Sequence, residues 1–354
     1  MKKILLLLLF PLLSNILFAQ HKEEADALVS EGVDRHDKGD YASAIKKYDE
    51  ALSLDKDNLS ALAEKALTLL TLEKYDESIV CCKQAIEKHE GSPNLKSVYV
   101  TYGNALDGLH KTEKAIAIYN EGLEQFPDFY QLQFNKGIAL SAVRSDEAFL
   151  CFQKAVMLKP DHPGSHNAIA RMLVLENKRI PALLAFCRFL VVEPTGDRAK
   201  ENLESVQKIM KGDVKKTGIN SITINVSPDM LQDSTADGKP KENSFNMTDL
   251  LLAMDAALDY DKKYKKNSDV EQFIRKFDNV CASLKETKKD NYGFYWSYYV
   301  PYFTEMKDKN LVETFAYIAF TSSKDADVAK WLKSHKEEVD KFYEWSNAFV
   351  WSAN

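Results

Sequence analysis

The sequence predicts an all-α protein in which a solenoid of about five helix–turn–helix repeats precedes a smaller C-terminal helical bundle. Residues 40–55 place small alanines and the aromatic Tyr48 at helical spacing. The same pattern returns at intervals of about 34 residues, and a proline closes the later copies. After residue 246 apolar residues still recur at helical spacing, but the 34-residue repeat is absent. These observations predict two helical regions of different construction.

The N-terminal stretch predicts a secretion signal peptide over residues 1–19. Lys2 and Lys3 precede an apolar run that ends at Phe18, and Ala19 is a small residue before an expected cleavage that leaves Gln20 first. The apolar run of about 15 residues is shorter than the roughly 20 that span a bilayer, so we expect no stable membrane span after cleavage. We therefore expect an exported bacterial protein, periplasmic or secreted.

Composition and the absence of known catalytic motifs argue against several classes of function. With 354 residues and a net charge of −6, the chain is long enough for roughly two cores and lacks the basic balance of a nucleic-acid-binding protein. No phosphate-binding loop, serine-hydrolase, zinc-protease or dinucleotide motif is present, so we predict no catalytic residue, metal or cofactor, and not an enzyme. His162 and His166 stand four apart, a spacing that could place two metal ligands on one helix face. Pro163 and Gly164 lie between them at a helix start and no obvious third ligand is near, so we predict no metal site there.

The five cysteines show no metal-binding spacing. Four fall on predicted second helices near the aromatic packing position, which predicts buried, unreactive thiols. One disulfide between Cys151 and Cys187 of neighbouring repeats stays open as an alternative.

Each repeat carries a small residue where its two helices would cross, because small side chains let backbones approach closely. An aromatic side chain or a thiol then fills the space toward the next repeat. In the first helices the small residues are Gly32, Ala66, Gly103, Gly137 and Ala170. In the second helices they are Ala44, Ser78, Ala115, Ala148 and Ala182, and the larger residues are Tyr48, Cys82, Tyr119, Phe152 and Phe186.

Over residues 23–195 this pattern resembles the tetratricopeptide repeat (TPR) family. The resemblance departs from the family where the first helix usually carries Trp, since this sequence has Leu28, Leu62, Tyr99, Gln133 and His166 there. Residues 197–211 form one more amphipathic stripe, which we interpret as a helix that caps the open end of the solenoid. The predicted solenoid domain is therefore 23–211.

The resemblance implies a non-enzymatic scaffold that binds a peptide or protein segment on a concave face lined by first helices. Carried over residue by residue, the predicted groove consists of Val29, Val33, His36, Ala63, Leu67, Val100, Asn104, Phe134, Ile138, Asn167 and Arg171. The family members that grip a C-terminal carboxylate use Lys and Asn where this sequence has Val29 and Val33. We therefore expect an apolar or amide-bearing peptide, whose identity the sequence does not give.

Residues 212–246 predict a linker with one strand-like segment, Ile222 to Val226, which would pack as extended chain, pair with a partner or occupy the groove. Residues 247–354 predict a separate domain of about five helices, one of them opened by a capping box at Ser268 and Glu271. Its aromatic run, Phe294 to Tyr299, favours a helix core over a ligand platform. The alternative function is an enzymatic or glycan-binding activity in this domain, with the repeats as a targeting arm.

Overall fold

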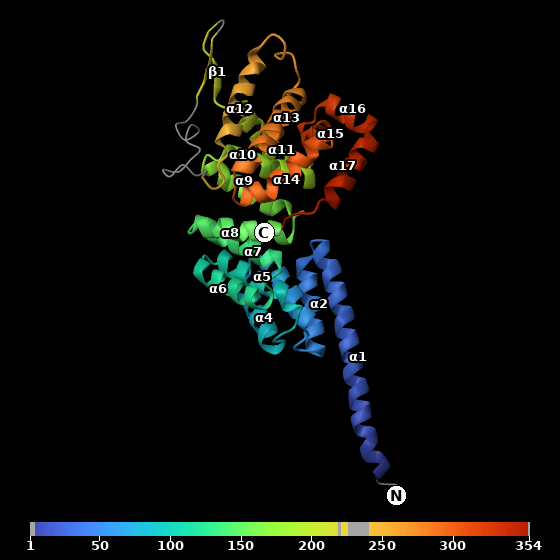
Figure 1. Cartoon of the computed structure of the whole chain (residues 1–354). Helices are drawn as coiled ribbons and strands as arrows, with labels where there is room; N and C mark the ends of the chain where they lie inside the picture. Colours follow the sequence, from blue (N-terminus) through green and yellow to red (C-terminus); the bar gives the residue numbers. More distant parts are fainter. Residues whose placement is uncertain (1–3, 219–220, 226–240, 353–354) are drawn as a thin grey trace. The chain divides into compact units, whose positions relative to one another are not determined.

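The computed structural model describes residues 4–218, 221–225 and 241–352, with side chains from Gln20 onward. Within these ranges the chain forms 17 α-helices and one two-stranded sheet, which confirms the all-α prediction (Figure 1). The chain divides into two compact units, Met1–Cys151 and Phe152–Asn354, and each is described by itself. None of the helices in the described ranges is both long enough and apolar enough to cross a membrane.

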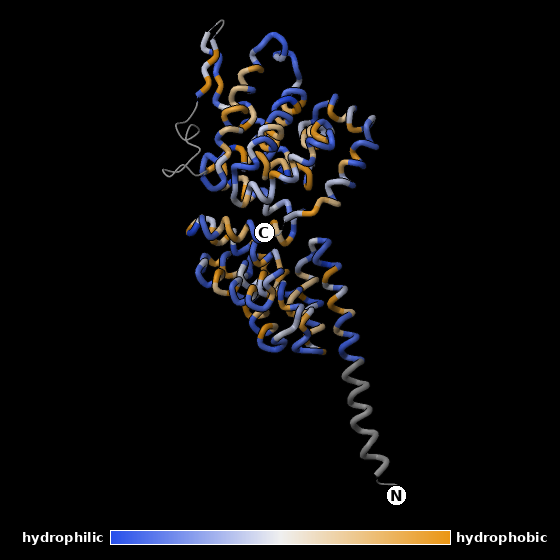
Figure 2. The backbone as a smooth tube through the Cα atoms, in the orientation of Figure 1, coloured by the Kyte–Doolittle hydropathy of each residue, from blue (hydrophilic) through white to orange (hydrophobic). Residues whose placement is uncertain are grey.

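The first unit is a stack of helix pairs. Along these helices hydrophilic and hydrophobic residues alternate, as they do in amphipathic helices (Figure 2). The helices are α1 (Ile4–Asp37), α2 (Tyr41–Leu54), α3 (Leu59–Thr71), α4 (Tyr75–Lys88), α5 (Leu95–Gly108), α6 (Thr112–Gln125) and α7 (Tyr130–Ser141), and α8 (Ser145–Leu158) runs across the boundary between the units. The predicted order of first and second helices is therefore present.

The predicted close crossings are also present. A Cβ atom on Gly32 would lie 2.8 Å from Cδ1 of Tyr48, and one on Gly103 would lie 2.7 Å from Cδ1 of Tyr119, with Cε1 of each ring closer still. Both tyrosines are buried. Glycine is required at these two positions because the ring of the second helix occupies the space of a side chain.

The second unit is built around α10 (Arg179–Val192). Every residue from Ile180 to Val191 is buried, because α9 and α11 pack on α10 and so do helices of the C-terminal region, α12, α14 and α15. A helix that is apolar all round is typically enclosed in this way. The other helices are α9 (Pro163–Leu175), α11 (Asp197–Lys211), α12 (Asn246–Ala257), α13 (Asp269–Thr287), α14 (Phe294–Asp308), α15 (Val312–Ala319), α16 (Ala326–Ser334) and α17 (Lys336–Ala348).

Helix α11 packs on α10, as expected of a cap, and it is covered in turn by α12 and α13. The C-terminal helices therefore share one core with the last repeat within this unit. The division into a solenoid that ends at residue 211 and a separate domain from 247 stays a prediction about which parts fold independently.

The aromatic run lies in the core on α14. Tyr295, Trp296, Tyr298 and Tyr299 are each at most 4% exposed. The Tyr298 hydroxyl donates to the carbonyl of Val156 (2.6 Å), and the Tyr299 hydroxyl lies 2.8 Å from Nδ1 of His166. These rings hold α14 against the last repeat, so they form no exposed ligand platform.

The strand-like segment has a partner within the chain. β2 (Ile222–Ile224) pairs antiparallel with β1 (Val214–Lys216), with Lys215 opposite Thr223. The sequence does not indicate β1, because two of its three residues are lysines. Of the predicted linker, residues 219–220 and 226–240 lie outside the described residues, so the prediction for Val226 does too. Phe245, near the end of the predicted linker, is buried and stacks on Trp296 with ring centroids 4.3 Å apart.

The cysteine prediction is confirmed. All five thiols are buried and none forms a disulfide, so the alternative pairing of Cys151 with Cys187 is wrong. Burial raises the pKa of Cys82 to about 12, which keeps this thiol protonated and unreactive at neutral pH.

Candidate functional site

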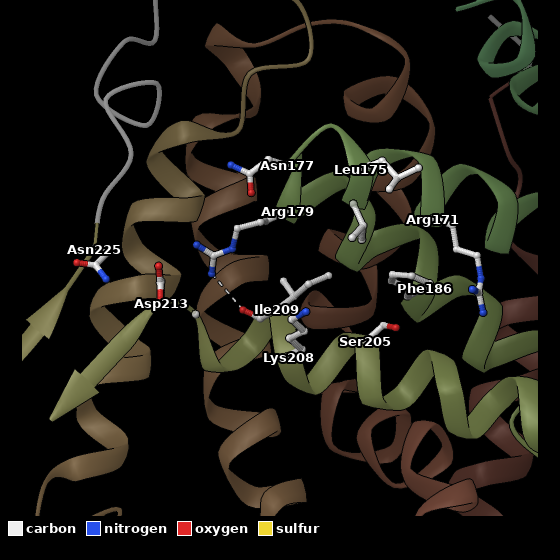
Figure 3. A pocket seen from close by; sticks show the side chains of 12 residues that line it. Arg171, Leu175, Asn177, Arg179, Phe186, Ser205, Lys208, Ile209, Asp213 and Asn225 are labelled. Atoms are coloured by element: carbon white, nitrogen blue, oxygen red, sulfur yellow. Dashed lines mark hydrogen bonds between the residues drawn. The ribbon is translucent and has the colours of Figure 1, made fainter. Parts of the chain in front are cut away.

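A groove of about 950 Å³ lies between α9 and α11, with α10 beneath it (Figure 3). Residues at the start of α10, residues of the turn after α11 and Asn225, which follows β2, complete its wall, and all of it belongs to the second unit. The lining consists of Arg171, Val174, Leu175, Asn177, Arg179, Phe186, Ser205, Lys208, Ile209, Gly212, Asp213 and Asn225.

Local sequence signals set the two walls. The His162 side chain accepts a hydrogen bond from the Ser165 backbone N–H and Pro163 opens the first turn, so α9 begins at a defined residue. Gly196, with φ of 91°, precedes α11, and Gly212, with φ of 58°, ends it. A left-handed residue at a helix end favours glycine, so both ends of α11 are fixed by sequence.

The middle of the groove is apolar. Leu175 at the end of α9 is 87% exposed and Val174 is 47% exposed, whereas Phe186 and Ile209 form a buried floor. Single exposed apolar side chains are common on protein surfaces and need no explanation. An exposed leucine beside a concave, apolar floor is different, because such a surface is typical of a binding site.

Charged side chains stand at both ends of the groove (Figure 3). Arg171 pairs with Glu201 at 2.8 Å and donates through Nε to Asn167. Arg179 donates from Nη2 to the Ile209 carbonyl (3.1 Å) and pairs with Asp249 at 3.3 Å. Burial raises the pKa of Asp249, and the neighbouring Arg179 guanidinium opposes that rise.

Two further charges in the groove have no ion pair within the described part of the chain, the Lys208 ammonium and the Asp213 carboxylate. Arg171 and Arg179 already have acidic partners. Lys208 is therefore the cation of the groove that is available to a ligand carboxylate.

The predicted groove residues divide between the two units. Arg171 lines the α9–α11 groove, and Asn167, one turn earlier on α9, binds Arg171. The other nine lie in the first unit. Leu67 (40%) and Ile138 (45%) are the exposed ones, while Val33, His36, Ala63, Val100, Asn104 and Phe134 are half-buried.

Three predicted residues are engaged inside the first unit. Val29 is only 7% exposed and packs with Ala25 and Tyr48 in the core, so its assignment to a ligand surface is wrong. The side-chain oxygen of Asn104 accepts a hydrogen bond from the Tyr119 hydroxyl at 2.7 Å, so the oxygen of this amide already has a partner. His36 Nδ1 lies 2.8 Å from the Thr68 hydroxyl.

The groove residues that the sequence did not point to include Leu175, the last residue of α9, and Ser205, Lys208 and Ile209 of α11. The α11 residues were not expected in a groove because residues 197–211 were interpreted only as a cap. The repeat spacing itself held the signal. A period of about 34 carries Asn167 to Glu201 and Arg171 to Ser205, so α11 occupies the place of a further first helix.

Comparison with known proteins identifies the repeats. Residues 33–159 match the family model for the Psidin N-terminal TPR repeats region. The chain contains tetratricopeptide repeats. Among curated proteins, the STIP1 homolog of Dictyostelium discoideum is 28% identical over 132 residues, which cover 34% of this chain and 22% of that protein. The Hsp70–Hsp90 organizing protein of Triticum aestivum is 34% identical over 93 residues, 25% of this chain and 16% of that protein.

This TPR chain thus spans less than a quarter of the length of either relative. Among solved structures, PilF of Pseudomonas aeruginosa matches with a TM-score of 0.48 at 20% identity, over 54% of this chain and 85% of PilF. A thermophilic TPR protein of Thermus thermophilus matches with a TM-score of 0.46 at 18% identity, over 52% of this chain and all of that protein.

Proposed function

We propose that this protein is a non-enzymatic interaction scaffold that binds a segment of a partner protein in the α9–α11 groove. TPR repeats are a protein–protein interaction module. The observation that supports this groove over other surfaces is Leu175, 87% exposed on the wall of a 950 Å³ groove with a buried apolar floor.

The lining defines the segment that would fit. Val174 and Leu175 suit an apolar side chain of the partner, and Lys208 suits a carboxylate near it, since the other two cations are already paired. The amide of Asn177 and the hydroxyl of Ser205 suit backbone groups of an extended chain. Such a segment is compatible with the apolar or amide-bearing peptide expected from the sequence, and the proposal adds one acidic position to it.

The test is photo-crosslinking of the full chain in its own cell extract. A photoreactive amino acid at Ser205 should trap a partner, while the same group at Leu150, an exposed apolar position on α8 (59%), should not. Leu175→Glu should reduce that capture at least tenfold and leave the circular dichroism spectrum unchanged. Equal capture from Ser205 and Leu150, or capture unaffected by Leu175→Glu, would exclude this groove.

We also propose that the chain is exported and acts in the cell envelope or outside the cell. The basis is the Lys2-Lys3 start, the apolar run and Ala19. The intact mass of the protein recovered from its own cells should correspond to a chain that begins at Gln20. A mass that includes Met1 would contradict the proposal.

A further inference from the structure

A second groove lies in the first unit, on the side formed by second helices. It has a volume of about 410 Å³ and is bounded by α4 and α6, with α5 beneath. It is separate from the surface that the repeats offer through their first helices. We call it the α4–α6 groove.

The floor of the α4–α6 groove is apolar. Ile79 of α4 and Leu106 of α5 are 8% and 6% exposed, and the half-buried ring of Tyr102 lies beside them. Ala117 of α6 is exposed on the wall, where its small side chain leaves room. A volume of this size admits one bulky apolar side chain, which would gain the free energy of burial on leaving water.

The rim is positively charged. Lys83, Lys111 and Lys114 line the groove, all three are exposed, and none forms an ion pair in the ranges that the structure describes. Asp76 is the acidic residue among the lining. The chain as a whole carries a net charge of −6, so three unpaired lysines around one apolar hollow are a local reversal of its charge.

The start of α6 adds to this potential. Lys111 occupies the N-cap position of α6 and its side chain makes no capping hydrogen bond. The first turn of a helix carries partial positive charge, so a carboxylate beside Lys111 and Lys114 would be stabilised by both the side chains and the helix.

We propose that the α4–α6 groove docks an acidic segment of a partner protein, which inserts one bulky apolar side chain between carboxylates. Charge complementarity selects the acidic flanks and the floor of Ile79 and Leu106 selects the anchor. The site is independent of the α9–α11 groove, so this chain would hold two different segments, one in each unit.

The test uses a fluorescein-labelled peptide with one Trp between pairs of Glu, and the full chain as the receptor. Fluorescence anisotropy should show saturable binding that weakens with added salt. The double substitution Lys83→Ala with Lys114→Ala should raise Kd about tenfold, as expected from the loss of two partly exposed ion pairs. The matched control is Lys38→Ala with Lys46→Ala, two exposed lysines of the same unit without ion pairs in its described part, and it should leave Kd unchanged.

Ala117→Glu provides a second variant that leaves the core intact and fills the groove with an opposing charge. It should abolish binding of the Glu-flanked peptide, whereas Lys83→Glu with Lys114→Glu should prefer a peptide whose Glu residues are replaced by Lys. A Gln-flanked peptide that binds as tightly as the Glu-flanked one would overturn the proposal. Peptide binding that is unaffected by Ala117→Glu would overturn it as well. So would either of two other occupants: phosphatidylserine vesicles that bind through the lysines while the peptide does not bind, or a second copy of the chain that associates through this groove in a salt-sensitive way.

Discussion

At the scale of single residues, the fold depends on pairs in which one partner must be small. Gly103 of α5 lies under the ring of Tyr119 of α6, and the hydroxyl of the same tyrosine donates to Asn104. The spacing of glycines, alanines and aromatic residues predicted these crossings. It did not predict that Asn104 is held by the crossing itself, because a position on a helix face does not say whether a side chain turns to solvent or to its neighbour.

Gly103→Ala tests this crossing. The added methyl group would overlap the Tyr119 ring, so we expect the free energy of unfolding to fall by about 1–3 kcal/mol. In a Tyr119→Leu background, the same substitution should cost measurably less, because the ring that it meets is gone. Chemical denaturation of the four proteins in this cycle measures the coupling, and additive effects would show that the two residues are not in contact.

His166 links stability to pH at the same scale. The ring is fully buried between the Tyr299 hydroxyl and the Pro160 carbonyl, and burial, reinforced by the nearby Arg188 charge, lowers its pKa from 6.5 to about 3. Above pH 6.5 the ring is neutral in both the folded and the unfolded chain. Below that pH the unfolded chain takes up a proton on His166, whereas the folded chain does not take it up until about pH 3. The free energy of unfolding therefore decreases as pH falls.

Between pH 6.5 and pH 5 this loss amounts to about 2 kcal/mol. A His166→Gln variant should be less stable at pH 7 but should lose about 2 kcal/mol less than the unsubstituted protein over that interval. Urea unfolding at pH 7, 6 and 5 measures the difference. Parallel stability curves for the two proteins would mean that His166 takes up its proton over the same pH range in the folded and the unfolded chain.

At the scale of elements, α10 decides how the second unit is assembled. Its buried Arg188 has no carboxylate partner in the described ranges; instead it donates to the Pro160 carbonyl and to the Tyr302 and Ser346 hydroxyls. The guanidinium also lies over the rings of Tyr302 and Trp351, 5.1 and 4.9 Å from their centroids. Aromatic faces thus take the place of an acid around this charge.

Trp351→Ala tests the C-terminal segment that covers Arg188. The indole stacks on Tyr302, contacts the ring of Tyr298 at a tilt and lies against the guanidinium, so its loss should cost about 2–4 kcal/mol and lower the melting temperature. Val350→Ala, at an adjacent position that is 87% exposed, should change the melting temperature little. Equal effects of the two substitutions would show that this segment contributes nothing specific.

At the scale of the whole molecule, the repeats could be predicted from sequence and the partition of the chain could not. The 34-residue period predicts five helix pairs because each pair repeats the same local chemistry. The enclosure of α10 depends on α14 and α15, which lie more than 100 residues later, and no periodicity connects them. Apart from Arg188, the residues from Ile180 to Val191 are apolar on all sides of the helix. This was the available signal, because a second helix facing solvent keeps one polar side.

Cleavage of the chain within residues 227–240 distinguishes the two ways to divide it. A protease site inserted within residues 227–240 allows the chain to be cut between the predicted solenoid and the predicted C-terminal domain, without a change to any described residue. If residues 247–354 form an independent domain, the two fragments should separate on size exclusion after cleavage. The contacts within the second unit favour the opposite result, because α14 and α15 bury Tyr299, Tyr302, Phe303 and Phe315 in the core that they share with α9 and α10. We therefore expect the cleaved protein to elute as one particle, and the second unit to melt in a single transition. Fragments that separate in native buffer would instead show that residues 247–354 form an independent domain.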